Sequence, residues 1–136
     1  MAIKKKSGRQ TTILAHVAFT FADFSRVTTV KDVQKAIEIP KGAVILGGGI
    51  VIDTVFNSTT SDVVTVGDVT TDNRYKAAIN AQALGLTALV PTGYKTAVST
   101  DIVLTLVPTG VAMPTTGAGR LWVEYYVENR SQSDQG

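Results

Sequence analysis

Apolar side chains recur at every second position in three parts of the chain, which is the pattern of a strand that turns one face to a core. The three parts are residues 11–21, 101–107 and 120–128. The alternating apolar sets are Ile13, Ala15, Val17, Phe19 and Phe21 in the first, Ile102, Leu104 and Leu106 in the second, and Leu121, Val123, Tyr125 and Val127 in the third. We therefore predict a strand in each part, with these residues facing inward.

The longest β-rich stretch, residues 37–57, is apolar on both alternating faces. The two sets are Ile50, Ile52 and Phe56 on one face, and Val51 and Val55 on the other. A strand with two apolar faces is at least partly covered on both sides, so this stretch is predicted to be central to the fold.

Proline and glycine interrupt this stretch twice. Pro40 lacks an amide hydrogen and Gly42 tolerates positive φ, so the chain is expected to turn there, between a short strand at residues 36–39 and the long one. The triplet Gly47-Gly48-Gly49 packs no side chains. It favours a β-bulge, or a sharp bend where the strand passes from one sheet to another.

Residues 72–85 give the only helix prediction. Asp72 or Asn73 can cap this helix, and Gly85 can end it. The remaining extended pieces are residues 62–66, 86–90 and 94–98. One small helix among many strands indicates an all-β fold, an antiparallel β-sandwich with one short helix in a connection.

The composition indicates a single domain with an apolar surface. The chain has 136 residues, enough for one core, and no cysteine, which excludes disulfides and thiolate metal sites. Only 18% of the residues are charged and the mean hydropathy is +0.17, so we expect part of the surface to be buried in an assembly. No apolar run approaches the ~20 residues that span a bilayer, and no signal-peptide core follows residues 1–9. The protein is therefore expected to be made in the cytoplasm.

Positive charge is concentrated at the amino terminus. The cationic residues there are Lys4, Lys5, Lys6 and Arg9. Because the net charge is +2, the remainder of the chain carries +2 − 4 = −2. We expect a basic arm (residues 1–11), a β-sandwich domain (12–128) and a polar tail (129–136). Such an arm binds nucleic acid, lies on an acidic protein surface or stays solvated, and the sequence leaves these alternatives open.

Residue types that carry catalysis are scarce. His16 is the only histidine, and it has neither an acidic neighbour nor a second histidine for a metal site. Residues 68–72 hold two aspartates without the spacing of a calcium loop, so we expect a hydrogen-bonded turn there. Nothing in the spacing brings together the carboxylates Asp53, Asp62, Asp68 and Glu124. We expect no enzyme activity, no cofactor and no metal. Nucleic-acid binding is not expected either, because basic and aromatic residues are not interleaved in the domain.

The outward set of the last predicted strand carries two aromatic residues. Trp122 and Tyr126 alternate there with the carboxylates Glu124 and Glu128. Exposed aromatic rings stack on sugars and are enriched in protein interfaces, whereas covered ones only complete a sandwich face. The sequence alone leaves these three interpretations open.

Three passages together resemble small virion proteins of tailed bacteriophages, the capsid decoration or cement protein family. They are IPKGAVILGGGIVIDTVFN, GDVTTDNRYKAAINAQALGLTALVPTGYKTA and RLWVEYYVENR, and the resemblance covers about residues 37–130. It implies a jelly-roll-like β-sandwich in the virion that binds the outside of the capsid as a small homo-oligomer, a dimer or trimer. The implied partner is the major capsid protein. The resemblance supplies no catalytic residue.

The expected function on this resemblance is adhesion that bridges capsid subunits and stabilises the head. The candidates for electrostatic anchoring to an acidic capsid surface are Lys4, Lys5, Lys6 and Arg9. The candidates for an aromatic contact with the capsid or with another copy are Trp122 and Tyr126. The alternative is a carbohydrate- or receptor-binding β-sandwich module of a phage fibre or baseplate, with a stacking platform chosen from Trp122, Tyr125 and Tyr126.

Overall fold

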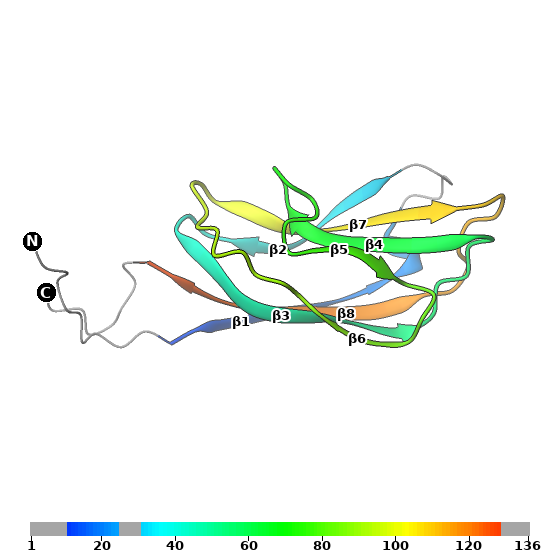
Figure 1. Cartoon of the computed structure of the whole chain (residues 1–136), viewed down its shortest axis with the longest axis horizontal. Coiled ribbons are helices and arrows are strands. Elements are labelled where there is room, and N and C mark those ends of the chain that lie inside the picture. The colour runs from blue at the N-terminus through cyan, green and yellow to red at the C-terminus, as the bar shows by residue number, and fades with distance from the viewer. Residues whose placement is uncertain (1–10, 25–30, 129–136) are drawn as a thin grey trace, which may run out of the picture.

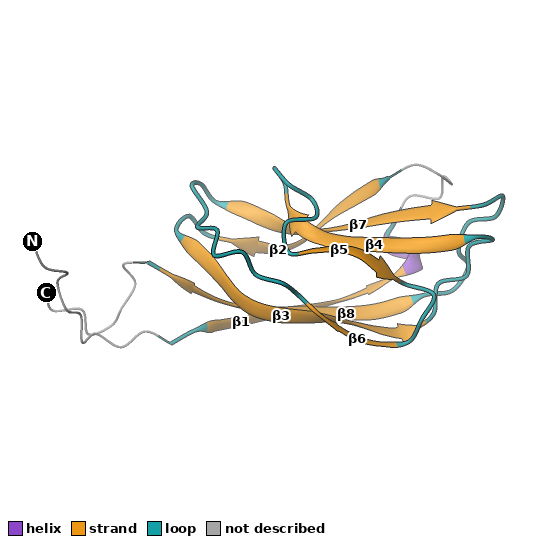
Figure 2. Ribbon diagram, viewed as in Figure 1, coloured by secondary structure: helices purple, strands orange, loops and turns teal. Residues whose placement is uncertain are grey.

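The computed structural model describes residues 11–24 and 31–128. They form two four-stranded sheets packed face to face (Figure 1, Figure 2). The strands are β1 (Ile13–Thr20), β2 (Asp32–Ile39), β3 (Ala43–Thr54), β4 (Ser61–Asp68), β5 (Lys76–Asn80), β6 (Gly85–Ala88), β7 (Thr100–Thr109) and β8 (Ala118–Val127). Within the described ranges the only helical element is a single 3-10 turn, η1 (Phe21–Asp23).

The strand order is that of a jelly roll. Sheet A has the order β1-β8-β3-β6, and sheet B has the order β2-β7-β4-β5. All ladders in both sheets are antiparallel. Successive strands cross from one sheet to the other, except at the β4–β5 connection, which stays in sheet B. The expected all-β, jelly-roll-like sandwich is thereby confirmed.

The core lies between the sheets and is lined by the alternating apolar sets. In β8 the predicted inward residues are all buried, namely Leu121, Val123, Tyr125 and Val127. Phe19, Phe24 and Phe56 meet at one end of the core, with ring centroids 6.2 to 6.4 Å apart. Two of the three ring pairs are edge-on, the arrangement that aromatic quadrupoles prefer.

A bulge lies directly before the glycine triplet in β3. The register between β3 and β8 shifts between Ile45 and Gly47, so Leu46 is the extra residue, and the three glycines pair regularly with β8. The expected bulge is therefore present, at the amino-terminal end of the triplet. The alternative, in which the strand passes there from one sheet to the other, is wrong, because the whole of β3 pairs within sheet A.

The helix predicted over residues 72–85 is absent. β5 occupies part of this range and β6 begins at Gly85. Tyr75 and Ile79 are buried and lie four residues apart, which imitates a helical stripe. In the structure Ile79 is paired with Val64 on β4, a contact that local spacing does not reveal. A helix this short is marginal in water, whereas the β4 ladder satisfies the same backbone groups.

Two further boundaries differ from expectation. β2 begins at Asp32, earlier than the strand expected from residue 36, because β7 supplies a partner for each end of the longer strand. The strand expected at residues 94–98 is reduced to one isolated bridge, between Val44 and Lys95.

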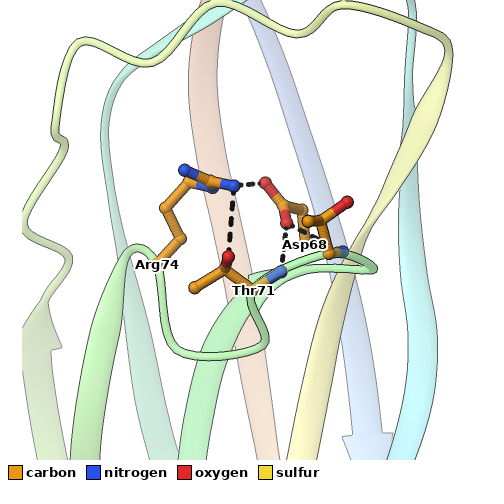
Figure 3. A network of polar contacts seen from close by, with 4 residues as sticks. Asp68, Thr71 and Arg74 are labelled. Atoms are coloured by element: carbon orange, nitrogen blue, oxygen red, sulfur yellow. Dashed lines mark hydrogen bonds and ion pairs between the residues drawn. The ribbon is translucent and has the colours of Figure 1, made fainter.

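The β4–β5 connection folds back over the outer face of sheet B. A methyl group on Gly67 would lie 2.2 Å from the carbonyl oxygen of Thr71, so only glycine allows this approach. Asp68 accepts hydrogen bonds from the backbone amides of Thr70 and Thr71 and from Nε of Arg74 (Figure 3). The hydrogen-bonded turn predicted at residues 68–72 is therefore confirmed.

This connection covers sheet B from outside. Val103 and Thr105 alternate with the core residues of β7 and so face away from the core, yet both are buried. Thr65 Oγ1 donates a hydrogen bond of 3.0 Å to the carbonyl oxygen of Asp72, which ties the connection to β4. The part of this outer face around Gly67, Val103 and Thr105 is thus covered by the chain's own backbone.

Candidate interaction surface

The outer face of sheet A carries no such cover among the described residues. The register aligns His16, Trp122, Gly49 and Ala88 in one row across β1, β8, β3 and β6. The next row consists of Ala18, Arg120, Val51 and Leu86. We call these two rows, together with Leu14, Gly47, Glu124 and Tyr126, the outer face of sheet A.

Trp122 lies near the centre of this face, against Gly49. A methyl group on Gly49 would lie 3.0 Å from Nε1 of Trp122 and 2.7 Å from Cδ1 of Leu86. The missing side chain at Gly49 therefore provides the space in which the indole and the leucine meet. Trp122 keeps 38% of its surface exposed in this position. The sequence predicted a bulge or bend at the glycine triplet. It contained no signal that Gly49 makes room for the side chain of Trp122.

The face is largely apolar. Leu14 at one edge is 62% exposed and Leu86 at the other edge is 64% exposed. Leu46, at the adjacent bulge, is 44% exposed. Exposed apolar side chains that gather on one face of a small domain mark a surface that binds another molecule.

The charged groups on this face already have partners. Nε and Nη2 of Arg120 each donate a 2.9 Å hydrogen bond to the carboxylate of Asp53. This contact lowers the pKa of the Asp53 carboxyl and raises the pKa of Arg120. Glu124 accepts a hydrogen bond of 3.2 Å from Oγ1 of Thr12. Both interactions are exposed, so they orient side chains more than they stabilise the fold.

The two aromatic candidates share the face but differ in accessibility. Trp122 and Tyr126 both alternate with the buried residues of β8, so they project outward about 13 Å apart along the strand. Tyr126 is half-buried, beside Val44. Tyr125, offered as a platform in the sugar-binding alternative, faces the core and is 6% exposed, so that choice is wrong.

The basic candidates Lys4, Lys5, Lys6 and Arg9 lie outside the described residues. Thr11 and Thr12 lead directly into β1, and Ile13 is paired with Tyr125 near the end of β8. The described chain therefore enters sheet A at the end where Tyr126 lies.

The carboxylates that an enzyme would need are held apart in separate structural contacts. Asp62 is buried and accepts hydrogen bonds from the backbone amide and Oγ of Ser58 and from Nε2 of Gln82. Asp53, Asp68 and Glu124 have the partners described above. In the described ranges no group of three or more His, Asp or Glu side chains could hold a metal ion.

No helix in the described part of the chain has the length and apolar character to cross a membrane.

Neither a protein-family model nor a curated protein matches the sequence. Two solved structures share the fold over nearly the whole chain. One chain of the cyanophage Pam1 capsid asymmetric unit has a TM-score of 0.67 and 23% identity, and the alignment covers 93% of this chain and 91% of that one. One chain of the acidic stable capsid structure of Helicobacter pylori bacteriophage KHP30 has a TM-score of 0.68 and 20% identity, with coverage of 92% and 94%. The chain thus has the same fold as proteins of similar length in these two capsids.

Proposed function

We propose that this protein is a virion structural protein that binds the outer surface of a bacteriophage capsid and bridges major capsid protein subunits. The observation that carries the proposal is the likeness to one chain each of the Pam1 and KHP30 capsids, over more than nine tenths of this chain and of each neighbour. The resemblance of three sequence passages to capsid decoration proteins points the same way.

The outer face of sheet A is the surface that we assign to the capsid contact. It combines a half-exposed tryptophan with exposed leucines at both edges. Buried tryptophan at the centre of an interface contributes a large share of binding energy when neighbouring side chains exclude water around it. Trp122 holds that central position, and Leu14 and Leu86 flank it on the edge strands.

The size of this face argues for many weak contacts. Four strands spaced ~4.8 Å apart and about eight residues long span roughly 500 Å². A standard stable interface needs about 800 Å² from each partner. One contact through this face is therefore weak, and retention on a capsid would come from each copy engaging adjacent subunits at once. Such bridging raises the force or temperature needed to separate the subunits.

The basic arm supplies the second contact in this proposal. The cations of residues 1–10 precede a remainder whose net charge is −2, so attraction to an acidic capsid surface would come from the arm. Because Thr11 and Thr12 lead into β1, the arm is attached to the same sheet that presents Trp122.

The sugar-binding alternative has less support on this face. Sugar sites place hydrogen-bonding groups beside the aromatic ring. On β8, Arg120 is already paired with Asp53, and Glu124 accepts a hydrogen bond from Thr12. A glycan array separates the two functions, because a capsid-binding protein should show no saturable sugar binding.

Co-sedimentation with phage particles that lack this protein tests the proposal. The wild-type chain is expected to pellet with the particles, and Leu86→Lys is expected to pellet less, because it places a charge in the apolar face. Val69→Lys is the matched control, since Val69 is 58% exposed but lies in the connection over sheet B. Equal loss for both variants, or no binding by the wild type, would refute the assignment.

A further inference from the structure

β1 is an open edge of sheet A. Within the described residues it is paired only with β8, over its full length of 8 residues. The opposite side of β1 therefore presents a row of backbone amide and carbonyl groups that another strand can pair with.

The composition of β1 provides none of the usual protection for an edge. Its sequence ILAHVAFT contains no Lys, Arg, Asp, Glu or Pro. Its register with β8 runs without a bulge. A long, regular, uncharged edge strand pairs with other strands unless something covers it.

The other three edges of the sandwich are protected. β2 carries Asp32, Lys35 and Glu38, and its register shifts between Lys35 and Ile37. β5 has 5 residues and an irregular register with β4, and β6 has only 4 residues. The contrast singles out β1 as the edge suited to pairing.

The core is also incompletely closed beside β1. Ile13, Ala15 and Val17 face the core but remain half-buried. A groove of about 250 Å³ opens between β1 and β2, and its apolar lining includes Val17, Phe19, Phe24 and Leu104. A strand added at β1 would bring further side chains against this opening.

We infer that β1 pairs with β1 of a second copy of this chain, antiparallel and about a two-fold axis, so that the two A sheets join into one. Such an arrangement is self-complementary, as a symmetric dimer requires. Because β1 carries no Lys, Arg, Asp or Glu, two copies meet without the repulsion that the charges of β2 would cause. The inference stands independently of capsid binding.

The alternation of β1 limits the register of this pairing. Directly opposed residues of antiparallel strands point to the same face, so inward residues must oppose inward residues. A pairing centred on His16 opposes Ala15 to Val17 and Leu14 to Ala18 of the other copy. A pairing centred on Val17 opposes His16 to Ala18. In both registers the outer faces of the two copies become continuous, with a combined area of roughly 1,000 Å².

Sedimentation velocity and cysteine cross-linking of the full chain test the inference. A dimer is expected at concentrations up to about 1 mM, where even an association with Kd near 1 mM is well populated. The chain has no cysteine of its own, so an introduced one is the only thiol. Opposed strand residues lie within reach of a disulfide, so His16→Cys alone, or His16→Cys combined with Ala18→Cys, should cross-link the dimer under oxidation. Leu86→Cys, which is also exposed but lies on the opposite edge strand of sheet A, should not.

A charge substitution supplies the complementary test. His16→Lys puts a cation on each of the paired edges and should weaken dimerisation by about tenfold or more, with an unchanged circular dichroism spectrum. Leu86→Lys should leave the dimer intact while weakening capsid binding, which separates this inference from the proposed function. A monomer throughout the concentration range would overturn the inference, and so would an oligomer that cross-links through Leu86→Cys but not through the β1 cysteines.

Discussion

The indole of Trp122 on β8 lies against Gly49 on β3, where any larger residue would meet it. An added methyl group would lie 3.0 Å from Nε1 and 3.2 Å from Cε2 of the indole. Gly49 and Trp122 are 73 positions apart in the sequence (122 − 49), and together they define the centre of the exposed apolar face. The glycine triplet therefore shapes the exposed surface of sheet A.

Gly49→Ala is expected to displace Trp122 with little loss of stability. The atoms that the new methyl group meets belong to the side chains of Trp122 and Leu86, which can move outward. We expect a change in free energy of unfolding of about 1 kcal/mol or less. Trp122 is the only tryptophan, so its fluorescence emission should shift, and capsid co-sedimentation should weaken.

Gly47→Ala is the matched control for this substitution, because nothing lies within 4 Å of a methyl group there. Unchanged tryptophan emission in Gly49→Ala, or an equal shift in both variants, would contradict the packing of Trp122 against Gly49.

Two Asp–Arg contacts should contribute unequally to stability. Asp68 is almost fully buried and accepts two backbone amide hydrogen bonds besides its contact with Arg74. Removing it in Asp68→Ala leaves these donors unpaired and should lower the free energy of unfolding by about 2–4 kcal/mol. Asp53→Ala breaks the exposed contact with Arg120 and should lower the free energy of unfolding far less, because solvent screens an exposed ion pair. Urea unfolding of the two variants measures the difference, and comparable losses would contradict the described burial.

Tyr75 should make the fold sensitive to alkaline pH. Its ring is buried, and its hydroxyl has no hydrogen-bond partner in the described structure. Burial is the main cause that raises the pKa of Tyr75 to about 12, from the usual tyrosine value of 10.0. A pKa that is higher in the folded state means that the unfolded state ionises first. The contribution of protonated Tyr75 to the free energy of unfolding is therefore complete below pH ~10. It is lost as the pH rises towards ~12, and the total loss is about 2–3 kcal/mol.

Tyr75→Phe isolates this effect from the other tyrosines. The variant should be as stable as the wild type or more stable at pH 8, because the hydroxyl that it removes is buried without a partner. Melting temperatures between pH 8 and 11 should fall less steeply in Tyr75→Phe than in the wild type. Parallel curves would show that Tyr75 does not carry the pH dependence.

The basic arm is expected to control the salt dependence of capsid binding. Replacing Lys4, Lys5, Lys6 and Arg9 by glutamine should weaken co-sedimentation at low salt and flatten its decline as salt rises, because the Debye length shortens to ~10 Å at 0.1 M. The melting temperature should not change, since the arm precedes the described sandwich. A variant that still occupies capsids fully at raised salt would remove the anchoring role from the arm.

Local alternation predicted the parts of the fold that depend on neighbouring residues in sequence. Leu121, Val123 and the other inward residues of β8 are buried as their spacing indicates. Tyr75 and Ile79 misled the helix prediction because the decisive partner of Ile79 is Val64, on a strand that only the folded chain brings alongside.

The candidate surface was predictable only in part, for the same reason. Trp122 and Tyr126 stand out in a sequence as outward aromatics, and the structure does set both on one face. Three other features arise from pairings between distant segments. They are the contact of Trp122 with Gly49, the unpaired edge of β1 and the connection that covers part of sheet B. Periodicity carries no information on such pairings, so the strand order and the exposed face had to come from the structure.

The copy number of this chain in purified virus particles is the decisive measurement for the proposed role as a capsid-binding structural protein. Quantitative mass spectrometry should measure it against the major capsid protein of the same particles. We expect a ratio near a simple fraction, because a protein that bridges lattice subunits repeats with the lattice symmetry. A few copies per particle, which fits a tail or fibre module, or absence from particles would contradict it.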